Sequence, residues 1–309
     1  MDLTKAKIWF VTLSTAIFVL FAISALQEED REWKKYQTQF FAMEQERGVD
    51  RDYSVKVRQI WNPQMGITDR CITCHMGMED LDVTNPYTQN PYKGHPKLAM
   101  MAKHPTNKLG CTVCHEGQGQ GTTVEGAHGL IHHWDYPMKI RRGAVNFIQS
   151  SCVKCHSYDQ LPEGTEQLVA GRALFDKYGC IGCHAAKVIA PDGGNQCPDL
   201  TGMGSKTESQ FSNTHRFAHV EKITEYEHTT KYQWLYQHFM DPQKITPADK
   251  VTGDLATVMP NFQLTETEAK LLTLFVSSIR DPAVDNIPNQ YVAKGPGKYS
   301  ILKAAPKKK

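Results

Sequence analysis

The sequence has almost no excess of charge of either sign. Lysine and arginine number 35 and aspartate and glutamate 33, which gives a formal net charge of +2. Nucleic-acid-binding proteins carry a strongly basic face, so this balance argues against a nucleic-acid partner. Long apolar runs are also scarce, and a mean hydropathy of −0.47 excludes a membrane protein with many spans. A hydrophobic content of 40% nevertheless argues against an intrinsically disordered chain.

The sequence also has almost no cysteine outside one repeated motif. Eight of its nine cysteines lie in four copies of the pattern Cys-x-x-Cys-His, and only Cys197 lies outside them. Four copies of one pattern indicate one chemical role used four times. The eight cysteines are Cys71, Cys74, Cys111, Cys114, Cys152, Cys155, Cys180 and Cys183, and the four histidines are His75, His115, His156 and His184.

This spacing is typical of covalent haem attachment. Two thiols three residues apart can each form a thioether to one of the two vinyl groups at a haem edge, and the next histidine ligates the iron. Zinc sites usually combine two Cys-x-x-Cys pairs, and neither zinc nor a redox disulfide requires the adjacent histidine. The sequence therefore predicts four covalently bound haem c groups, with the four histidines as proximal iron ligands.

The one long apolar run lies near the N-terminus. Residues 8–26 form 19 positions without a charge, about the length of a helix that crosses a bilayer core. Lys5 and Lys7 precede the run, and the positive-inside bias predicts a cytoplasmic N-terminus. The haem regions would then lie on the periplasmic or equivalent side of the inner membrane. A cleaved signal peptide is the alternative, but its apolar region is usually about 7–15 residues, which favours a single retained anchor.

An amphipathic helix is predicted after the anchor. Trp33, Tyr36, Phe40 and Met43 recur at intervals of three and four, which predicts a helix continuous with the anchor and ended by Gly48. Residues 1–48 would thus be an anchor with a stalk. The apolar stripe needs a cover, either the protein's own haem region or a neighbouring membrane subunit.

The stretch 49–163 has little periodicity and contains three of the four motifs. A stretch of this length buries little apolar side chain unless another group supplies apolar mass. Three haems would supply that mass, so we expect a loop-rich three-haem segment. The first cysteines of successive motifs are 40 and 41 residues apart, which favours close contact between neighbouring haems.

The sixth ligand of each iron decides between electron transfer and catalysis. With a histidine or methionine there, the iron can only gain or lose an electron. An iron with an open position can bind a substrate. His95 and His104 each precede a proline and are therefore expected in loops. The preferred distal ligands are His104, His128 and His132, with His95, His133 and Met138 as substitutes. The sequence does not assign these residues to individual haems.

Helical periodicity returns at residue 164. The segment GRALFDKYGCIGCH is followed by Pro198-Asp199-Leu200, by Met259-Pro260 and by LTETEAKLLTLFVSSI, in which Thr265 and Glu268 form a capping pair. Together these features resemble the class I cytochrome c fold, an all-α domain, over 164–285 with an insertion at about 205–232. The resemblance implies that Met259 is the distal ligand of the fourth haem. A thioether ligand raises the reduction potential relative to two imidazoles.

The earlier part of the chain has a second likeness. VRQIWNPQMGITDRCITCH, HPTNKLGCTVCHEGQGQGTT, HHWDYPM and SSCVKCH resemble the multihaem cytochrome c subunits of bacterial quinol-oxidising complexes of the cytochrome bc type. The resemblance implies a membrane-anchored tetrahaem cytochrome that receives electrons from cytochrome b and Rieske-type subunits and passes them to a soluble cytochrome or another acceptor. The alternatives are a multihaem reductase of a small oxyanion, which needs an open haem site, and a free-standing quinol dehydrogenase.

The predicted fold is therefore mainly α with extensive loops. It comprises the N-terminal transmembrane helix, the three-haem segment, the class I domain and a basic tail at 286–309. The segment 294–309, KGPGKYSILKAAPKKK, has six lysines and no acidic residue and is expected to be a disordered tail, with weak docking to an acidic partner or to anionic lipid as the alternative. By itself the chain is expected to be an electron-transfer subunit rather than an enzyme.

Overall fold

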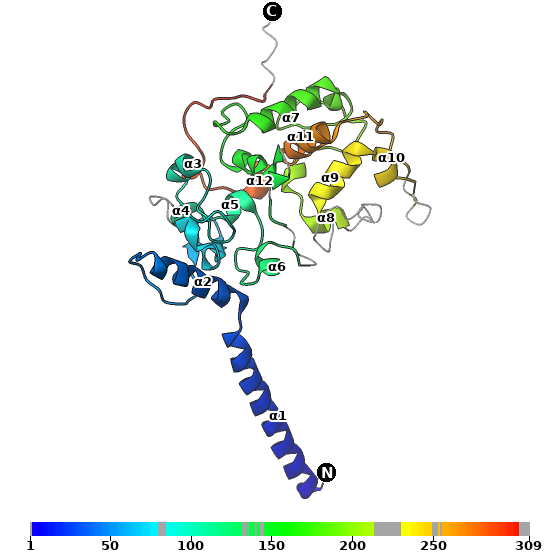
Figure 1. The fold of residues 1–309 in the computed structure, drawn as a ribbon. Coiled ribbons are helices and arrows are strands. Elements are labelled where there is room, and N and C mark those ends of the chain that lie inside the picture. The colour runs from blue at the N-terminus through cyan, green and yellow to red at the C-terminus, as the bar shows by residue number, and fades with distance from the viewer. Residues whose placement is uncertain are drawn as a thin grey trace, which may run out of the picture.

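The computed structural model is mainly helical, with two short two-stranded sheets in the part of the chain that it describes. The described residues are 2–79, 85–131, 134, 136–139, 141–142, 145–212, 230–248, 253 and 255–302. One long helix projects from the body, and the last described residues lie at the opposite end of the molecule (Figure 1). The predicted mainly α class is confirmed.

The projecting helix is α1 (Leu3–Glu29). None of its residues is buried, and it is long and apolar enough to cross a membrane. Asp2 caps its first turn, since its carboxylate accepts a hydrogen bond from the Thr4 amide at 3.3 Å. A helix that is apolar on every side requires a non-aqueous surrounding. By its length and composition this helix has the properties of a membrane span or of a signal sequence.

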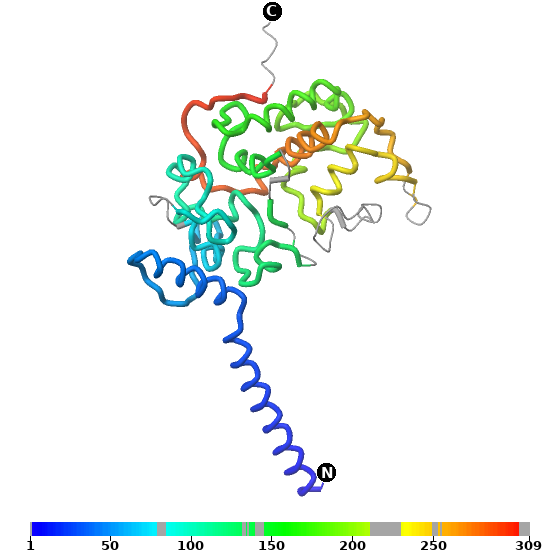
Figure 2. The backbone as a smooth tube through the Cα atoms, viewed as in Figure 1, coloured from blue at the N-terminus to red at the C-terminus, as the bar shows by residue number. Residues whose placement is uncertain are grey.

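The expected continuity between anchor and stalk is wrong. Helix α1 ends at Glu29, and α2 (Glu32–Glu46) begins after Arg31, whose backbone is extended at φ −65° and ψ 137°. The change of direction lays α2 against the body (Figure 2). As expected, Gly48 follows the end of this helix, with a φ of 68° that favours glycine.

The apolar stripe of α2 packs on the protein itself. Phe40 and Phe41 form a buried cluster with Met76 and Tyr92, which lie around the first motif. The Phe40 and Tyr92 rings are stacked with their centroids 6.1 Å apart. In the structure, this apolar stripe is therefore covered by residues of the same chain.

The segment that contains the first three motifs has only short regular elements, joined by loops. Strands β1 and β2 pair antiparallel with Ile60 opposite Asp69, and β3 pairs with β4. The elements are β1 (Ile60–Asn62), β2 (Ile67–Asp69), η1 (Cys71–Thr73), η2 (Met76–Glu79), α3 (Leu98–Lys103), α4 (Thr106–Leu109), α5 (Thr112–His115), α6 (Val124–Ala127), β3 (Arg141–Arg142), β4 (Val145–Asn146) and the 3-10 helix η3 (Phe147–Lys154).

Longer helices follow in the C-terminal part. They are α7 (Glu166–Lys177), α9 (Lys231–Met240) and α11 (Glu266–Val276), with the shorter η4 (Cys180–Gly182), η5 (Met203–Ser205), α8 (Glu208–Ser212), α10 (Pro242–Ile245) and α12 (Pro282–Asp285). Helix α11 packs on both α7 and α9. Gly171 permits the close crossing of α7 and α11, because a Cβ there would collide with the Leu271 carbonyl oxygen. Thr265 and Glu268 form the expected capping box at the start of α11.

The core of this part extends beyond the predicted domain limits. Phe147 and Leu161 on one side and Ile301 on the other are buried in the same cluster as α7 and α11. Ile301 is only 3% exposed, and the Leu161 amide donates to the Tyr299 carbonyl oxygen at 2.9 Å. The expectation of disorder from residue 294 onward is therefore wrong at Tyr299 and Ile301, which are bound to the body, whereas residues 303–309 lie outside the described residues. So do residues 213–229 of the predicted insertion.

Candidate functional site

The four Cys-x-x-Cys-His motifs have the same backbone geometry. In each of them the histidine amide donates to the carbonyl oxygen of the first cysteine, and so does the amide of the second cysteine, closing one tight turn. The histidine bonds to Cys71, Cys111, Cys152 and Cys180 are 2.9, 3.0, 2.9 and 3.0 Å long, and each bond from the second cysteine is 3.2 Å. One conformation repeated four times agrees with one chemical role.

The cysteines form no disulfide bonds with one another. All nine cysteines lie within the described residues, and all are free thiols. Burial raises the pKa of the Cys74, Cys155 and Cys180 thiols to about 11. The one group of three metal-ligating side chains in the described part of the chain is Asp69, Cys71 and Cys111. A structural zinc site needs four ligands, and no group of four is found among these residues.

Three of the motif histidines each face a second histidine. These second histidines come from loops or helix ends that sequence spacing alone does not connect to the motifs. The ring centroids of His75 and His128 are 6.3 Å apart, those of His115 and His95 6.4 Å, and those of His156 and His104 6.2 Å.

This separation fits a metal ion held between two imidazoles. A metal–imidazole bond is about 2.0 Å, and each ring centre lies roughly 1.1 Å behind its nitrogen, so the two centres should be about 6 Å apart. The interplanar angles are 43°, 80° and 52°. Rings on opposite sides of a metal can rotate about their common axis, so these angles do not need to agree.

Burial favours the neutral form of these rings. It lowers the pKa of His75 and of His115 to about 4. It also lowers the pKa of His95, His128 and His156. A neutral imidazole has the free lone pair that a metal ion needs, so burial favours the ligating form of these five rings.

The fourth motif has a different environment. His184 Nδ1 lies 2.8 Å from the Pro198 carbonyl oxygen. Because a carbonyl oxygen can only accept, Nδ1 carries the proton and Nε2 keeps its lone pair for a metal. Met259 is partly buried against the cluster that Cys180 also contacts, and its carbonyl oxygen accepts a hydrogen bond from Gln243 Nε2 at 2.6 Å.

The remaining predicted ligands lie elsewhere. His132 and His133 are outside the described residues. Met138 lies beside the first pair of rings, because its amide donates to the His128 carbonyl oxygen at 2.9 Å. Two of the three preferred histidines, His104 and His128, thus face motif histidines. The substitute His95 faces His115, the histidine of the second motif.

The first three motifs follow one another in space in the order of the chain. The first is joined to α2, since Gln37 Nε2 donates to the Thr73 carbonyl oxygen at 2.9 Å. The sulfur atoms of Cys71 and Cys111 lie within 4.8 Å of each other, so the first and second motifs are neighbours. The Ser151 hydroxyl donates to the Cys114 carbonyl oxygen at 2.8 Å. The second motif therefore lies between the first and the third.

A buried charge cluster joins the second motif to the C-terminal helices. Glu116 follows His115 with a φ of 56°, unusual for a residue other than glycine. Its Oε1 lies 2.9 Å from Lys139 Nζ and 3.5 Å from Arg280 Nη1, and its Oε2 accepts the Tyr232 hydroxyl at 2.7 Å. Burial alone would raise the pKa of Glu116, but the surrounding cations hold it well below its usual value. Sequence patterns give no signal for this cluster.

The fold and the site together define a helical chain with one apolar N-terminal helix and four equivalent Cys-x-x-Cys-His turns. Three of those turns have an imidazole opposite their own. No family model, curated protein or solved structure matches the chain. Its function has to be inferred from its own residues.

Proposed function

We propose that the chain is a membrane-anchored electron-transfer protein that holds four covalently attached haem c groups. The observation that carries this proposal is the set of three imidazole pairs whose ring centres are 6.2–6.4 Å apart. The thiols of each motif would hold the haem edge. The axial ligands would be His75 with His128, His115 with His95, His156 with His104, and His184 with Met259.

The paired imidazoles favour electron transfer over catalysis. An iron porphyrin with two imidazole ligands exchanges one electron and has no open position for a substrate. The rival function, reduction of a small oxyanion, needs at least one open position. His128, His95 and His104 would close the first three positions, because each faces one of the motif histidines.

Several features support a class I cytochrome c type of domain around the fourth motif. Helix α7 leads into this motif and crosses α11 closely at Gly171. The bond between His184 Nδ1 and the Pro198 carbonyl oxygen fixes the imidazole from the Pro-Asp-Leu loop. A Met259 thioether would raise the potential of the fourth site above the potentials of the imidazole-paired sites. The C-terminal domain is therefore the natural end from which electrons leave.

The arrangement along the molecule suggests where partners bind. Helix α2 connects the anchor to the first motif, whereas α7 and α11 lie at the opposite end of the body from α1 (Figure 2). A quinol-oxidising partner in the inner membrane, with cytochrome b and Rieske-type subunits, would meet the first end. A soluble cytochrome or other acceptor would meet the second on the periplasmic side.

The proposal is tested on the full chain purified in mild detergent. The intact mass should exceed that of the polypeptide by four haem groups, and magnetic-resonance spectra should contain only low-spin iron. His104→Ala should convert at least the iron of the third motif to the high-spin form. His238→Ala is the matched control, because His238 stacks on Trp234 and faces no motif histidine. A bare polypeptide mass would overturn the proposal, and high-spin iron in the native protein would favour the reductase.

The partner is tested separately. We expect a cytochrome b-like subunit to copurify with the chain from membranes solubilised in mild detergent. Recovery of the chain alone, with quinol-oxidising activity, would favour a free-standing quinol dehydrogenase instead.

A further inference from the structure

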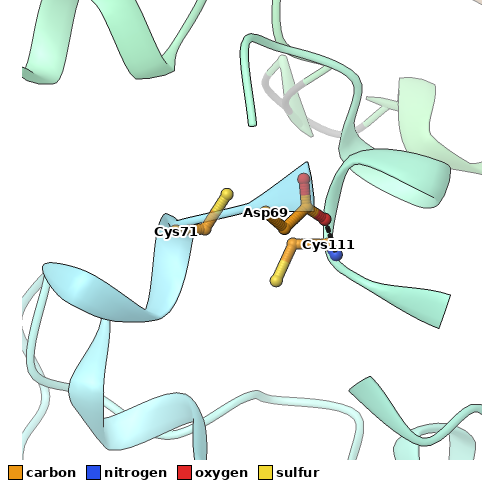
Figure 3. Close-up of side chains that lie close together, drawn as sticks. All are labelled: Asp69, Cys71 and Cys111. Carbon is orange, nitrogen blue, oxygen red and sulfur yellow. Dashed lines mark hydrogen bonds between the residues drawn. The ribbon is translucent and has the colours of Figure 1, made fainter. Parts of the chain in front are cut away.

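Asp69 is a buried carboxylate that the haem-binding scheme does not use. It is the last residue of β2 and is 0% exposed. Although it lies next to the first motif in sequence, its hydrogen bonds go to the second. It accepts the Cys111 amide at 2.5 Å (Figure 3). It also accepts the Thr112 amide at 2.9 Å and the Thr112 hydroxyl at 2.8 Å. Charged hydrogen bonds of this kind are stronger than neutral ones.

The surrounding backbone is shaped for this carboxylate. Gly110 directly precedes the second motif with a φ of 69°, and Gly119 follows the motif. A Cβ at either glycine would collide with an Asp69 carboxylate oxygen. The Arg70 amide also donates to the Gly119 carbonyl oxygen at 2.7 Å. The loop around the second motif therefore closes on Asp69 from both sides.

The opposite end of the same turn is held by the third motif. Lys154 Nζ donates to the Val113 carbonyl oxygen at 3.0 Å, and the Ser151 hydroxyl donates to the Cys114 carbonyl oxygen at 2.8 Å. The second motif thus has its free amide groups bound by a residue next to the first motif. Its free carbonyl groups are bound by residues of the third.

We propose that Asp69 is a positioning residue that fixes the second haem-attachment turn against the first and places one negative charge between the two groups attached there. The inference rests on the proposed function, because it assumes haem at both motifs. The Cys71 sulfur, the Cys111 sulfur and an Asp69 oxygen all lie within 4.8 Å of one another (Figure 3). The thioether edges of two neighbouring haems would therefore share this carboxylate.

Two physical consequences follow from this placement. A buried negative charge interacts strongly with nearby charges, since little water screens it. With haem bound, it would stabilise the oxidised, more positive iron and so lower the reduction potentials of the first two sites. The hydrogen bonds to Cys111 and Thr112 also hold the first two motifs close together, and this spacing would set the magnetic interaction between two irons bound there.

The test uses Asp69→Asn and Asp69→Ala in the full chain. Asp69→Asn removes the charge and keeps the shape, so two of the four centres should titrate at higher potential while the other two stay unchanged. Asp69→Ala removes the hydrogen bonds as well, so magnetic-resonance spectra should lose the coupling between one pair of irons. The matched control is Asp159→Asn, because Asp159 is an exposed aspartate that follows the third motif and is bonded to Ser157.

The outcomes separate this inference from the proposed function. Intact mass is measured first for every variant. A native chain without haem would overturn the proposed function, and this inference with it. A native chain with four haems, together with Asp69 variants whose potentials and coupling equal those of Asp159→Asn, would overturn only the inference. A uniform shift of all four potentials would also overturn it, because the charge lies beside two sites.

Discussion

The charge cluster around Glu116 gives the sharpest prediction about stability. Glu116→Gln keeps the length of the side chain and an oxygen that can accept the Tyr232 hydroxyl, but it removes the negative charge and places an amide NH2 donor, in place of an acceptor, toward the surrounding cations. The side chains of Glu116 and Lys139 are 4% and 0% exposed, and Lys154 Nζ and Arg280 Nη1 lie 3.4 and 3.5 Å from Glu116 Oε1. The variant would leave three cations close together with their central counter-charge gone.

The expected cost follows from this burial. Removing one partner of a buried ion pair destabilises a protein by about 3–5 kcal/mol, because the remaining charge stays desolvated and unpaired. Replacing both partners can be nearly neutral. We therefore expect Glu116→Gln to lower the free energy of unfolding by about 3–5 kcal/mol. The double variant Glu116→Gln/Lys139→Met should recover a substantial part of that loss.

The assay is guanidinium unfolding of the full chain in detergent, followed by far-ultraviolet circular dichroism. Glu163→Gln is the control, because the pair of Lys298 and Glu163 is 52% and 80% exposed and should contribute less than about 1 kcal/mol. If Glu116→Gln and Glu163→Gln unfold alike, the cluster does not hold the second motif to the C-terminal helices.

Three further variants test separate parts of the fold. Gly171→Ala should destabilise the crossing of α7 and α11 by about 1–3 kcal/mol; an unchanged melting temperature would contradict this. Gln37→Leu should free α2 by removing the bond to the Thr73 carbonyl oxygen, and hydrogen exchange in α2 should rise. Hydrogen bonds, chiefly from the Thr265 amide, lower the pKa of Glu268 to about 2. The stability it contributes is present above about pH 4.5 and lost toward pH 2. Glu268→Gln should therefore be less stable than the native chain at pH 7 and equal to it near pH 2.

The features that the sequence predicted correctly are local ones. Thr265 and Glu268 lie three residues apart, so the pattern itself contains both partners of the capping box. The end of α2 before Gly48 and the apolar character of α1 likewise depend on residues within a few turns. No local sequence pattern predicts the extended backbone at Arg31. The direction of α2 after this residue depends on a distant contact, the packing of Phe40 on Tyr92.

The parts of the site that the sequence could not assign depend on the path of the chain. His128 follows the second motif but faces His75 of the first, and His104 precedes the second motif but faces His156 of the third. Asp69 and the Cys111 amide that it binds are separated by 42 positions. Contacts of this range have no local pattern, so sequence spacing left the pairing of histidines open and passed over Asp69 and Glu116 entirely.

The crossed pairing also explains how a segment with so little regular structure can be ordered. His95 and His104 lie at the two ends of one short stretch around α3, yet they face His115 and His156, which belong to different motifs. A group bound between each pair would tie that stretch to two motifs at once, as metal ligation does when it supplies folding energy. Because small apolar cores stabilise a chain weakly, such ties matter most where side-chain packing is sparse. Loss of His104 should therefore loosen the stretch that carries His95, so the second and third sites are expected to depend on each other for their assembly.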